Sequence, residues 1–318
     1  MATENATVAL FGAGSWGTAL AIQLARNGVN VNLWGHEPHH IENLLRDREN
    51  REYLPGIRLE ANIRPLADMQ QCLQGADTVL IVIPSKAFRE FLQQLSSILQ
   101  QDISVFWASK GFEIETGKLL HELVIEELPG HNYGVISGPT FAAEVARGLP
   151  AAITCAGNNA TDTAFFAGLL HCRSFRCYTS EDVVGVELGG ALKNILAIAV
   201  GIADGLGFGA NTRAALMTRG LSEVMRLGSQ LGSQQETLMG LAGLGDLILT
   251  CTDDQSRNRR FGLAVGQGKS ISEAEIAVGQ TVEGLRAARA IYFLAKELEL
   301  ELPIMEQVYL VLYEGVKP

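Results

Sequence analysis

A strand that leads into a glycine-rich turn and then into a helix is the feature that most constrains this fold. Thr7–Phe11 is a short apolar run typical of a buried strand, and the motif Gly12-Ala-Gly-Ser-Trp-Gly17 follows it directly. The first glycine allows a tight turn, the second lets the backbone approach a pyrophosphate, and the third lets the helix pack closely on the sheet. The helix N-terminus offers N–H groups and a positive dipole end to the phosphates. The pattern predicts a dinucleotide site, with an ordinary glycine turn as the alternative. Its residues are Gly12, Gly14, Ser15, Trp16 and Gly17.

Strand and helix signals alternate through the first half of the chain. The predicted strands are continuous apolar runs, as expected for a parallel sheet buried on both faces. They are Thr7–Phe11, Val29–Trp34, Asp77–Ile83, Ile103–Ala108, Gly134–Ile136, Ala151–Cys155 and Phe175–Tyr178. Helical patterns fall between them at Ser15–Arg26, Ala87–Leu99, Gly117–Glu127 and Thr163–Leu170. This alternation predicts an α/β fold with a doubly wound, Rossmann-like sheet.

The composition changes near Thr179, after which strand signals become sparse and helical periodicity takes over. Glu181 and Asp182 suit the start of a long helix, where acidic side chains meet the positive end of the dipole. We therefore predict a dinucleotide-binding domain over residues 1–179 and an all-α substrate-binding domain over residues 180–318.

Charge and composition exclude several classes of protein. Of the 318 residues, 47% are hydrophobic and only 19% are charged, which excludes intrinsic disorder. The net charge of −10 argues against a nucleic-acid binder that relies on a basic face. The longest uncharged apolar run, Ile195–Ala203, is shorter than the roughly 18 residues of a membrane span, and the first residues lack the basic region of a secretory signal. Five scattered cysteines predict reduced thiols in a cytoplasmic protein and no metal site.

Two isolated charges stand out in the apolar second half. Residues 188–203 contain one charged side chain, Lys193, and residues 237–252 contain one, Asp246. An isolated buried charge is costly and is normally paired, so we expect the two to meet. Burial would lower the pKa of the lysine and the aspartate would raise it, which suits proton exchange with a substrate hydroxyl near neutral pH. Asn194 and Thr250 could add hydrogen bonds. The alternative is a lysine that reaches the surface and an aspartate that caps a helix.

Further polar motifs follow predicted strands or form a basic turn. Ser256-Arg-Asn-Arg-Arg260 is a local positive cluster whose arginines suit a phosphate, with a solvated basic turn as the alternative. Pro84-Ser85, Ala108-Ser-Lys-Gly111 and Ser137-Gly-Pro-Thr-Phe-Ala142 each follow a strand, at the edge where open α/β sheets bind ligands. We expect these loops to converge on one crevice.

The cofactor type depends on the end of the second predicted strand. The acidic residue that selects NAD usually lies about 20 residues after the glycine motif, and this count reaches His36 or Glu37. If His36 takes the place, no carboxylate repels a 2′-phosphate and NADP is acceptable. Otherwise His36 is simply a loop histidine. NAD and NADP therefore both remain open.

Taken together, these motifs resemble the bacterial NAD(P)-dependent glycerol-3-phosphate dehydrogenase family, in order and across nearly the whole chain. They are Gly12–Gly17, Ala108–Gly111, Ser137–Thr140, Glu187–Asn194, Gly243–Asp246, Ser256–Asn258 and Val282–Gly284. The resemblance implies hydride transfer between nicotinamide and the pair glycerol 3-phosphate and dihydroxyacetone phosphate. It also implies a cytoplasmic homodimer that supplies glycerophospholipid synthesis.

The resemblance also implies roles for individual residues. Lys193 would be the proton acceptor or donor, positioned by Asp246, Thr250 and Asn194, and Lys110 would lie between cofactor and substrate. The other substrate-binding residues would be Gly138, Thr140, Ser256, Arg257 and Asn258. The dinucleotide would contact Ser15, Trp16, His36, Ala142, Arg257 and Glu283. No role is assigned to Thr281, Arg259 or Arg260.

Two rival functions remain compatible with parts of the pattern. One is a two-domain dehydrogenase of the same architecture that acts on a hydroxyacyl or sugar acid substrate. The other is a non-catalytic dinucleotide sensor, which would keep the glycine motif but would not need Lys193 or Asp246.

Overall fold

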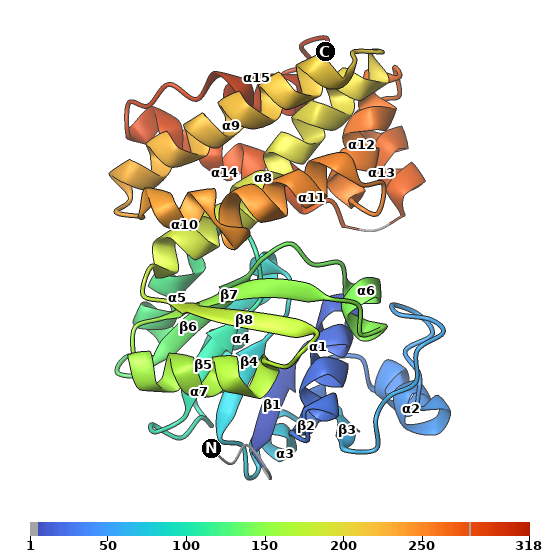
Figure 1. The fold of residues 1–318 in the computed structure, drawn as a ribbon, viewed down its shortest axis with the longest axis vertical. Coiled ribbons are helices and arrows are strands. Elements are labelled where there is room, and N and C mark those ends of the chain that lie inside the picture. The colour runs from blue at the N-terminus through green and yellow to red at the C-terminus, as the bar shows by residue number, and fades with distance from the viewer. Residues whose placement is uncertain (1–5, 280) are drawn as a thin grey trace. The chain divides into compact units, whose positions relative to one another are not determined.

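A computed structural model describes residues 6–279 and 281–318 (Figure 1). The chain divides into two compact units. The first contains residues up to 109 together with 121–136 and 140–183, and the second contains 110–120, 137–139 and 184–318. Two short segments that follow strands of the sheet thus belong to the second unit. The domain boundary between residues 179 and 180 stays a prediction.

The first unit contains one sheet with the strand order β3-β2-β1-β4-β5-β6-β7-β8. The chain moves outward from β1 to β3 and then returns to the other side of β1, which is the topological switch point of a doubly wound sheet. The pairs β1·β2, β1·β4, β2·β3, β4·β5, β5·β6 and β7·β8 are parallel. The strands are β1 Thr7–Phe11, β2 Asn30–Trp34, β3 Ile63–Leu66, β4 Thr78–Ile81, β5 Ser104–Trp107, β6 Tyr133–Ser137, β7 Ala151–Gly157 and β8 Phe175–Ser180. The predicted Rossmann-like sheet is confirmed.

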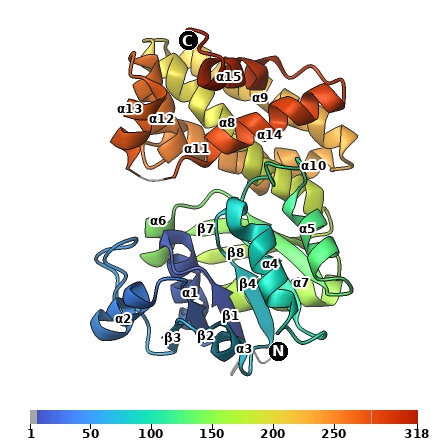
Figure 2. The same cartoon turned by 180° about the vertical axis from the view of Figure 1, so that it is seen from behind.

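Helices cover both faces of this sheet. In Figure 1 α7 lies in front of it, and in the reverse view of Figure 2 α4 does. The core is apolar, and Phe106 on β5 stacks on Phe166 of α7 with ring centroids 4.1 Å apart. The helices are α1 Ser15–Arg26, α2 Pro38–Asp47, α3 Met69–Leu73, the 3₁₀ turn η1 Ser85–Ala87, α4 Phe88–Ser96, α5 Leu120–Glu127, α6 Ala142–Ala146 and α7 Ala160–Leu170.

The second unit is helical after β8, as predicted. Its core is built around α8, whose apolar residues are almost completely buried. This helix is long and apolar enough to cross a membrane, but 94% of its most apolar window is buried inside the protein, as in the core helix of a soluble fold. The helices are α8 Val183–Gly205, α9 Ala210–Gln230, α10 Gln235–Met239, the π-helical turn η2 Leu241–Gly245, α11 Asp246–Thr252, α12 Arg257–Gly266, α13 Ile271–Val278, α14 Glu283–Glu297 and α15 Pro303–Tyr313.

Glycines bring the backbones of α8 and α12 into direct contact. A Cβ atom at Gly201 would lie 2.2 Å from the carbonyl oxygen of Arg259, and one at Gly262 would lie 2.2 Å from that of Ile198. No side chain fits at either position. This close approach fixes the start of α12, and with it the basic turn, beside the helix that carries Lys193.

Candidate active site

The glycine turn after β1 has the geometry that a pyrophosphate needs. Gly12 has φ +124°, and a Cβ atom there would lie 2.2 Å from the carbonyl oxygen of Val82, so only glycine fits. At Gly14 an added Cβ would meet nothing within 4 Å, which leaves the backbone open to a ligand. At Gly17 it would lie 1.8 Å from the carbonyl oxygen of Gly12. No side chain among the described residues caps the N-terminus of α1, so its N–H groups can donate to phosphate oxygens. These residues fit a dinucleotide.

Two buried side chains that could not be recognised from the sequence contact the backbone of this turn at Ala13. Asn50 is 0% exposed and donates through Nδ2 to the carbonyl oxygen of Ala13 at 2.9 Å and to Oγ1 of Thr18 at 2.7 Å. A ring nitrogen of His40 lies 3.3 Å from the same carbonyl oxygen. Asn50 stands in a polar stretch without periodicity, so only its contacts reveal the role.

Other loops lie beside the glycine turn at the carboxyl edge of the sheet. Val82 donates its backbone N–H to the carbonyl oxygen of Phe11 at 2.7 Å. The hydroxyl of Ser109 donates to the carbonyl oxygen of Ile83 at 2.6 Å, which joins the loops after β4 and β5. The ends of β1, β4 and β5 are thus tied together where an open α/β sheet binds its ligand.

The remaining predicted dinucleotide contacts are accessible. Ser15 and Trp16 occupy the first turn of α1 and are partly exposed. His36 lies just after β2 with a side chain that is 78% exposed, and its Nε2 atom is 3.2 Å from Oε1 of Glu37. Ala142 and Glu283 are the first residues of α6 and α14. Their roles toward a cofactor stay predictions.

Two lysines meet one aspartate in the second unit. Nζ of Lys193 is 2.5 Å from Oδ1 of Asp246, and Nζ of Lys110 is 2.7 Å from Oδ2 of the same carboxylate. Asp246 is 0% exposed. The sequence pointed to Lys193 and Asp246 as a pair, whereas Lys110 is a further partner contributed by the loop after β5.

Local glycine packing builds this lysine–aspartate cluster of Lys110, Lys193 and Asp246. A Cβ atom at Gly189 would lie 2.3 Å from the carbonyl oxygen of Ala242 in η2, so α8 touches the π-helical turn directly before Asp246. At Gly190 an added Cβ would lie 3.4 Å from the side chain of Lys110. Lys193 follows one turn later on α8, within reach of both. Such π-helical turns are frequent at functional sites.

The electrostatics suit reversible proton transfer. Burial and the neighbouring ammonium of Lys110 both lower the pKa of Lys193, and Asp246 opposes them; the net result is a pKa of about 8 instead of 10.5. The ammonium group of Lys193 is therefore a much stronger acid than an exposed lysine, and it can give up or regain a proton near neutral pH.

A second polar cluster surrounds Asn194 and not Lys193. Nδ2 of Asn258 donates to Oδ1 of Asn194 at 2.8 Å, and Nδ2 of Asn194 lies 3.4 Å from Oε2 of Glu283. The backbone N–H of Gly284 donates to Oδ1 of Asn258 at 2.9 Å. Thr250 donates mainly to the carbonyl oxygen of Asp246, at 2.6 Å, and its hydroxyl is 3.5 Å from Oδ1 of that residue.

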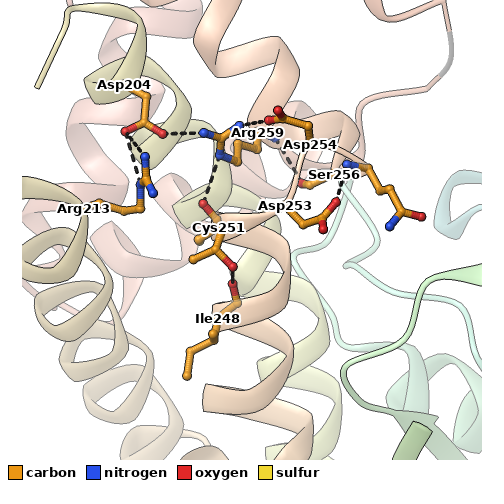
Figure 3. Close-up of polar contacts among 10 residues, drawn as sticks. Asp204, Arg213, Ile248, Cys251, Asp253, Asp254, Ser256 and Arg259 are labelled. Atoms are coloured by element: carbon orange, nitrogen blue, oxygen red, sulfur yellow. Dashed lines mark hydrogen bonds and ion pairs between the residues drawn. The ribbon is translucent and has the colours of Figure 1, made fainter. Parts of the chain in front are cut away.

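The basic turn separates into arginines with different surroundings. Ser256 caps α12, accepting the backbone N–H of Arg259 at 3.2 Å. Arg257 is the first residue of α12, half-buried, and has no hydrogen bond or ion pair within the described part of the chain. Arg259 is buried and fully engaged with other protein groups (Figure 3), and Arg260 is exposed. The turn is therefore not a uniform positive surface. Gly138 and Thr140 follow β6, and their roles stay predictions.

This combination of fold and site defines a class, the two-domain nicotinamide-dependent dehydrogenases. Family models of the N-terminal and C-terminal parts of NAD-dependent glycerol-3-phosphate dehydrogenase match residues 7–163 and 182–318. The chain belongs to the NAD-dependent glycerol-3-phosphate dehydrogenase family and is an NAD(P)-dependent oxidoreductase.

Individual relatives agree with this assignment. The chain is 51% identical over 318 residues to glycerol-3-phosphate dehydrogenase [NAD(P)+] of Shewanella halifaxensis, with 99% of this chain and 94% of the relative covered. It is 52% identical over 316 residues to the protein of that name from Nitrosococcus oceani, with 99% and 92% covered. The crystal structure of glycerol-3-phosphate dehydrogenase from Coxiella burnetii has a TM-score of 0.96 at 46% identity and covers 99% of this chain and 96% of its own.

Proposed function

We propose that the protein interconverts sn-glycerol 3-phosphate and dihydroxyacetone phosphate with NAD or NADP, and that Lys193 is the general acid and base. The observation that carries the proposal is the buried lysine–aspartate cluster, in which the pKa of Lys193 is lowered to about 8. A secondary hydroxyl needs such a group to release or accept its proton. Family membership supports the substrate pair.

The proton balance follows from this cluster. In the reducing direction the carbonyl oxygen of the ketone takes the proton from the ammonium of Lys193, and in the oxidising direction the neutral amine takes it from the hydroxyl. A nicotinamide bound beside the substrate would supply or accept the hydride. Asp246 holds the ammonium of Lys193 at 2.5 Å, so the proton donor is oriented before the substrate arrives. Asp246 also holds Lys110, a second positive charge that favours an anionic substrate.

We assign phosphate recognition to the N-terminus of α12. Arg257 is half-buried and without a protein partner in the described residues, and its planar fork suits a phosphate dianion. Ser256 and Asn258 are buried beside it. For the dinucleotide, the open backbone at Gly14 and the uncapped start of α1 would hold the pyrophosphate. His36 and Glu37 are both near the end of β2, so NAD and NADP both remain candidates.

The wider role rests on the family resemblance. We propose that the enzyme is a cytoplasmic homodimer and that it supplies glycerol 3-phosphate for glycerophospholipid synthesis. Gel filtration with light scattering measures the oligomeric state, and a monomer at micromolar concentration would contradict the dimer.

The decisive experiment is a spectrophotometric assay of NADH and NADPH oxidation with a panel of substrates. We expect dihydroxyacetone phosphate to be turned over far faster than hydroxyacyl or sugar acid ketones. We expect Lys193→Ala to abolish turnover while the dissociation constant for NADH, measured by fluorescence, stays nearly unchanged. Near-normal turnover in this variant would refute the lysine mechanism, and a different preferred ketone would refute the substrate.

A further inference from the structure

Arg259 is a buried arginine for which the proposed chemistry has no use. It lies in the first turn of α12, and its side chain is only 10% exposed. Nε donates to the carbonyl oxygen of Cys251 at 3.1 Å, Nη2 to Oδ2 of Asp204 at 2.8 Å, and Nη1 to the carboxylate of Asp254 (Figure 3). Each of the three nitrogens thus has its own acceptor.

These acceptors come from three different segments. Asp204 lies at the C-terminal end of α8, Cys251 lies in the last turn of α11, and Asp254 lies in the link between α11 and α12. The last carbonyl oxygens of a helix have no partner within the helix, so the one at Cys251 is available to a guanidinium. One side chain therefore joins the end of α11, the link and the end of α8 to the start of α12.

A comparison with the neighbouring Arg213 shows which bonds of Arg259 are not shared with another arginine. Arg213 on α9 also binds Asp204, with Nη2 3.0 Å and Nε 3.3 Å from Oδ1. The buried carboxylate of Asp204 therefore has a second cation of its own. The side-chain bonds to the carbonyl oxygen of Cys251 and to Asp254, by contrast, come only from Arg259 among the described residues (Figure 3). What Arg259 adds is the connection between α11 and α12.

We propose that Arg259 is a positioning residue that sets the place of the phosphate-binding turn relative to the proton-transfer cluster, an inference that rests on the proposed function. Helix α11 begins at Asp246, α12 begins at Arg257, and residues 253–256 link them. A shift of the link moves Arg257 and Asn258 together relative to Asp246. Misplacement by about 1 Å can reduce a rate roughly 100-fold. A lysine in place of Arg259 would present a single ammonium and could not reach three separate acceptors.

The test compares two matched substitutions, Arg259→Lys and Arg213→Lys, because both arginines bind the carboxylate of Asp204. The readout is kcat/KM for dihydroxyacetone phosphate divided by kcat/KM for unphosphorylated dihydroxyacetone, measured with saturating NADH. For Arg259→Lys we expect this ratio to fall about tenfold or more, mainly through KM for the phosphorylated substrate. For Arg213→Lys we expect a ratio within about twofold of the wild type, because the link between α11 and α12 keeps its arginine.

Equal losses on both substrates, or equal losses in both variants, would overturn the positioning role and leave Arg259 a general contributor to stability. If Arg259→Lys does not fold, Asp254→Ala decides, because the Asp254 side chain is 79% exposed and its removal deletes one of the three bonds. We expect it to lower the ratio about threefold, and an unchanged ratio overturns the proposal. Failure of the proposed function is distinct, because the wild type itself would then not turn over dihydroxyacetone phosphate.

Discussion

Replacing the proposed catalytic lysine should remove a cost to stability as well as the activity. In Lys193→Met the side chain keeps its length and apolar stem but loses the ammonium. Burial lowers the pKa of Lys193 from 10.5 to about 8 against the opposing effect of Asp246, a difference of 10.5 − 8 = 2.5 pH units. At about 1.4 kcal/mol per unit, ionised Lys193 destabilises the folded state by about 3 kcal/mol relative to the unfolded chain.

The pH dependence of the free energy of unfolding follows from whether the folded or the unfolded chain binds the proton of Lys193 more tightly. The folded pKa is depressed, so between pH 8 and pH 10.5 the unfolded chain binds more protons than the folded one. The contribution of Lys193 to the free energy of unfolding is complete above pH 10.5 and is lost as the pH falls through 8. The wild type should therefore gain about 3 kcal/mol across this window from Lys193, and the methionine variant should not. At pH 7 the inactive variant should be at least as stable as the wild type.

Urea unfolding followed by circular dichroism at pH 7, 8, 9 and 10 measures this difference. Lys269→Met is the matched control, because Lys269 is exposed in the same unit, and we expect its curve to run parallel to the wild type. If the free energies of unfolding of the wild type and Lys193→Met also run parallel over the whole range, the assigned burial and pKa of Lys193 are wrong.

Three further changes test the phosphate site, the cofactor turn and the helix packing. Arg257→Ala should raise KM for dihydroxyacetone phosphate about 10- to 100-fold, whereas a flat KM with weaker binding of an unphosphorylated analogue would contradict the role. Asn50→Ala should weaken NADH binding in a fluorescence titration about tenfold, because the buried carbonyl oxygen of Ala13 in the glycine turn loses its amide donor at 2.9 Å; an unchanged dissociation constant would count against it. Gly262→Ala should destabilise the protein by about 1–3 kcal/mol in thermal unfolding, since its Cβ would lie 2.2 Å from a carbonyl oxygen. Gly168→Ala should not destabilise the protein, because an added Cβ there would meet nothing within 4 Å. Equal melting temperatures of the two variants would refute the packing argument.

Most of the sheet could be predicted because its central strands are buried on both faces and therefore form continuous apolar runs. The strand β3 was missed, since Ile63-Arg-Pro-Leu66 contains a charge and a proline. Both are tolerated there because β3 is the edge strand of the sheet, where one side of the backbone needs no partner. Helix α2, from Pro38 to Asp47, was missed as well, because only three of its side chains are buried. Exposed elements at an edge leave little hydrophobic signal.

The site could be predicted only where a residue stands out from its own neighbours in the sequence. Lys193 and Asp246 did so, because each is the single charge in a long apolar stretch. Lys110 did not reveal its pairing with Asp246, which lies 136 positions away in the chain. Arg257 and Arg259 look alike in the sequence. Only the fold shows that Arg257 has no hydrogen bond or ion pair with the described residues, whereas Arg259 is bound by Asp204, Cys251 and Asp254.

The charges of the lysine–aspartate cluster also bear on the direction of the reaction. Two ammonium groups share one carboxylate, so the cluster carries one excess positive charge when both lysines are protonated. In the proposed complex the substrate phosphate would add negative charge near this cluster and would raise the pKa of Lys193 above its value of about 8 in the free protein. In the complex the ammonium form is then favoured at neutral pH, and this is the form that reduction of the ketone requires. Oxidation of the alcohol requires the neutral amine and should therefore need a higher pH, so the pH optimum for oxidation should lie above that for reduction.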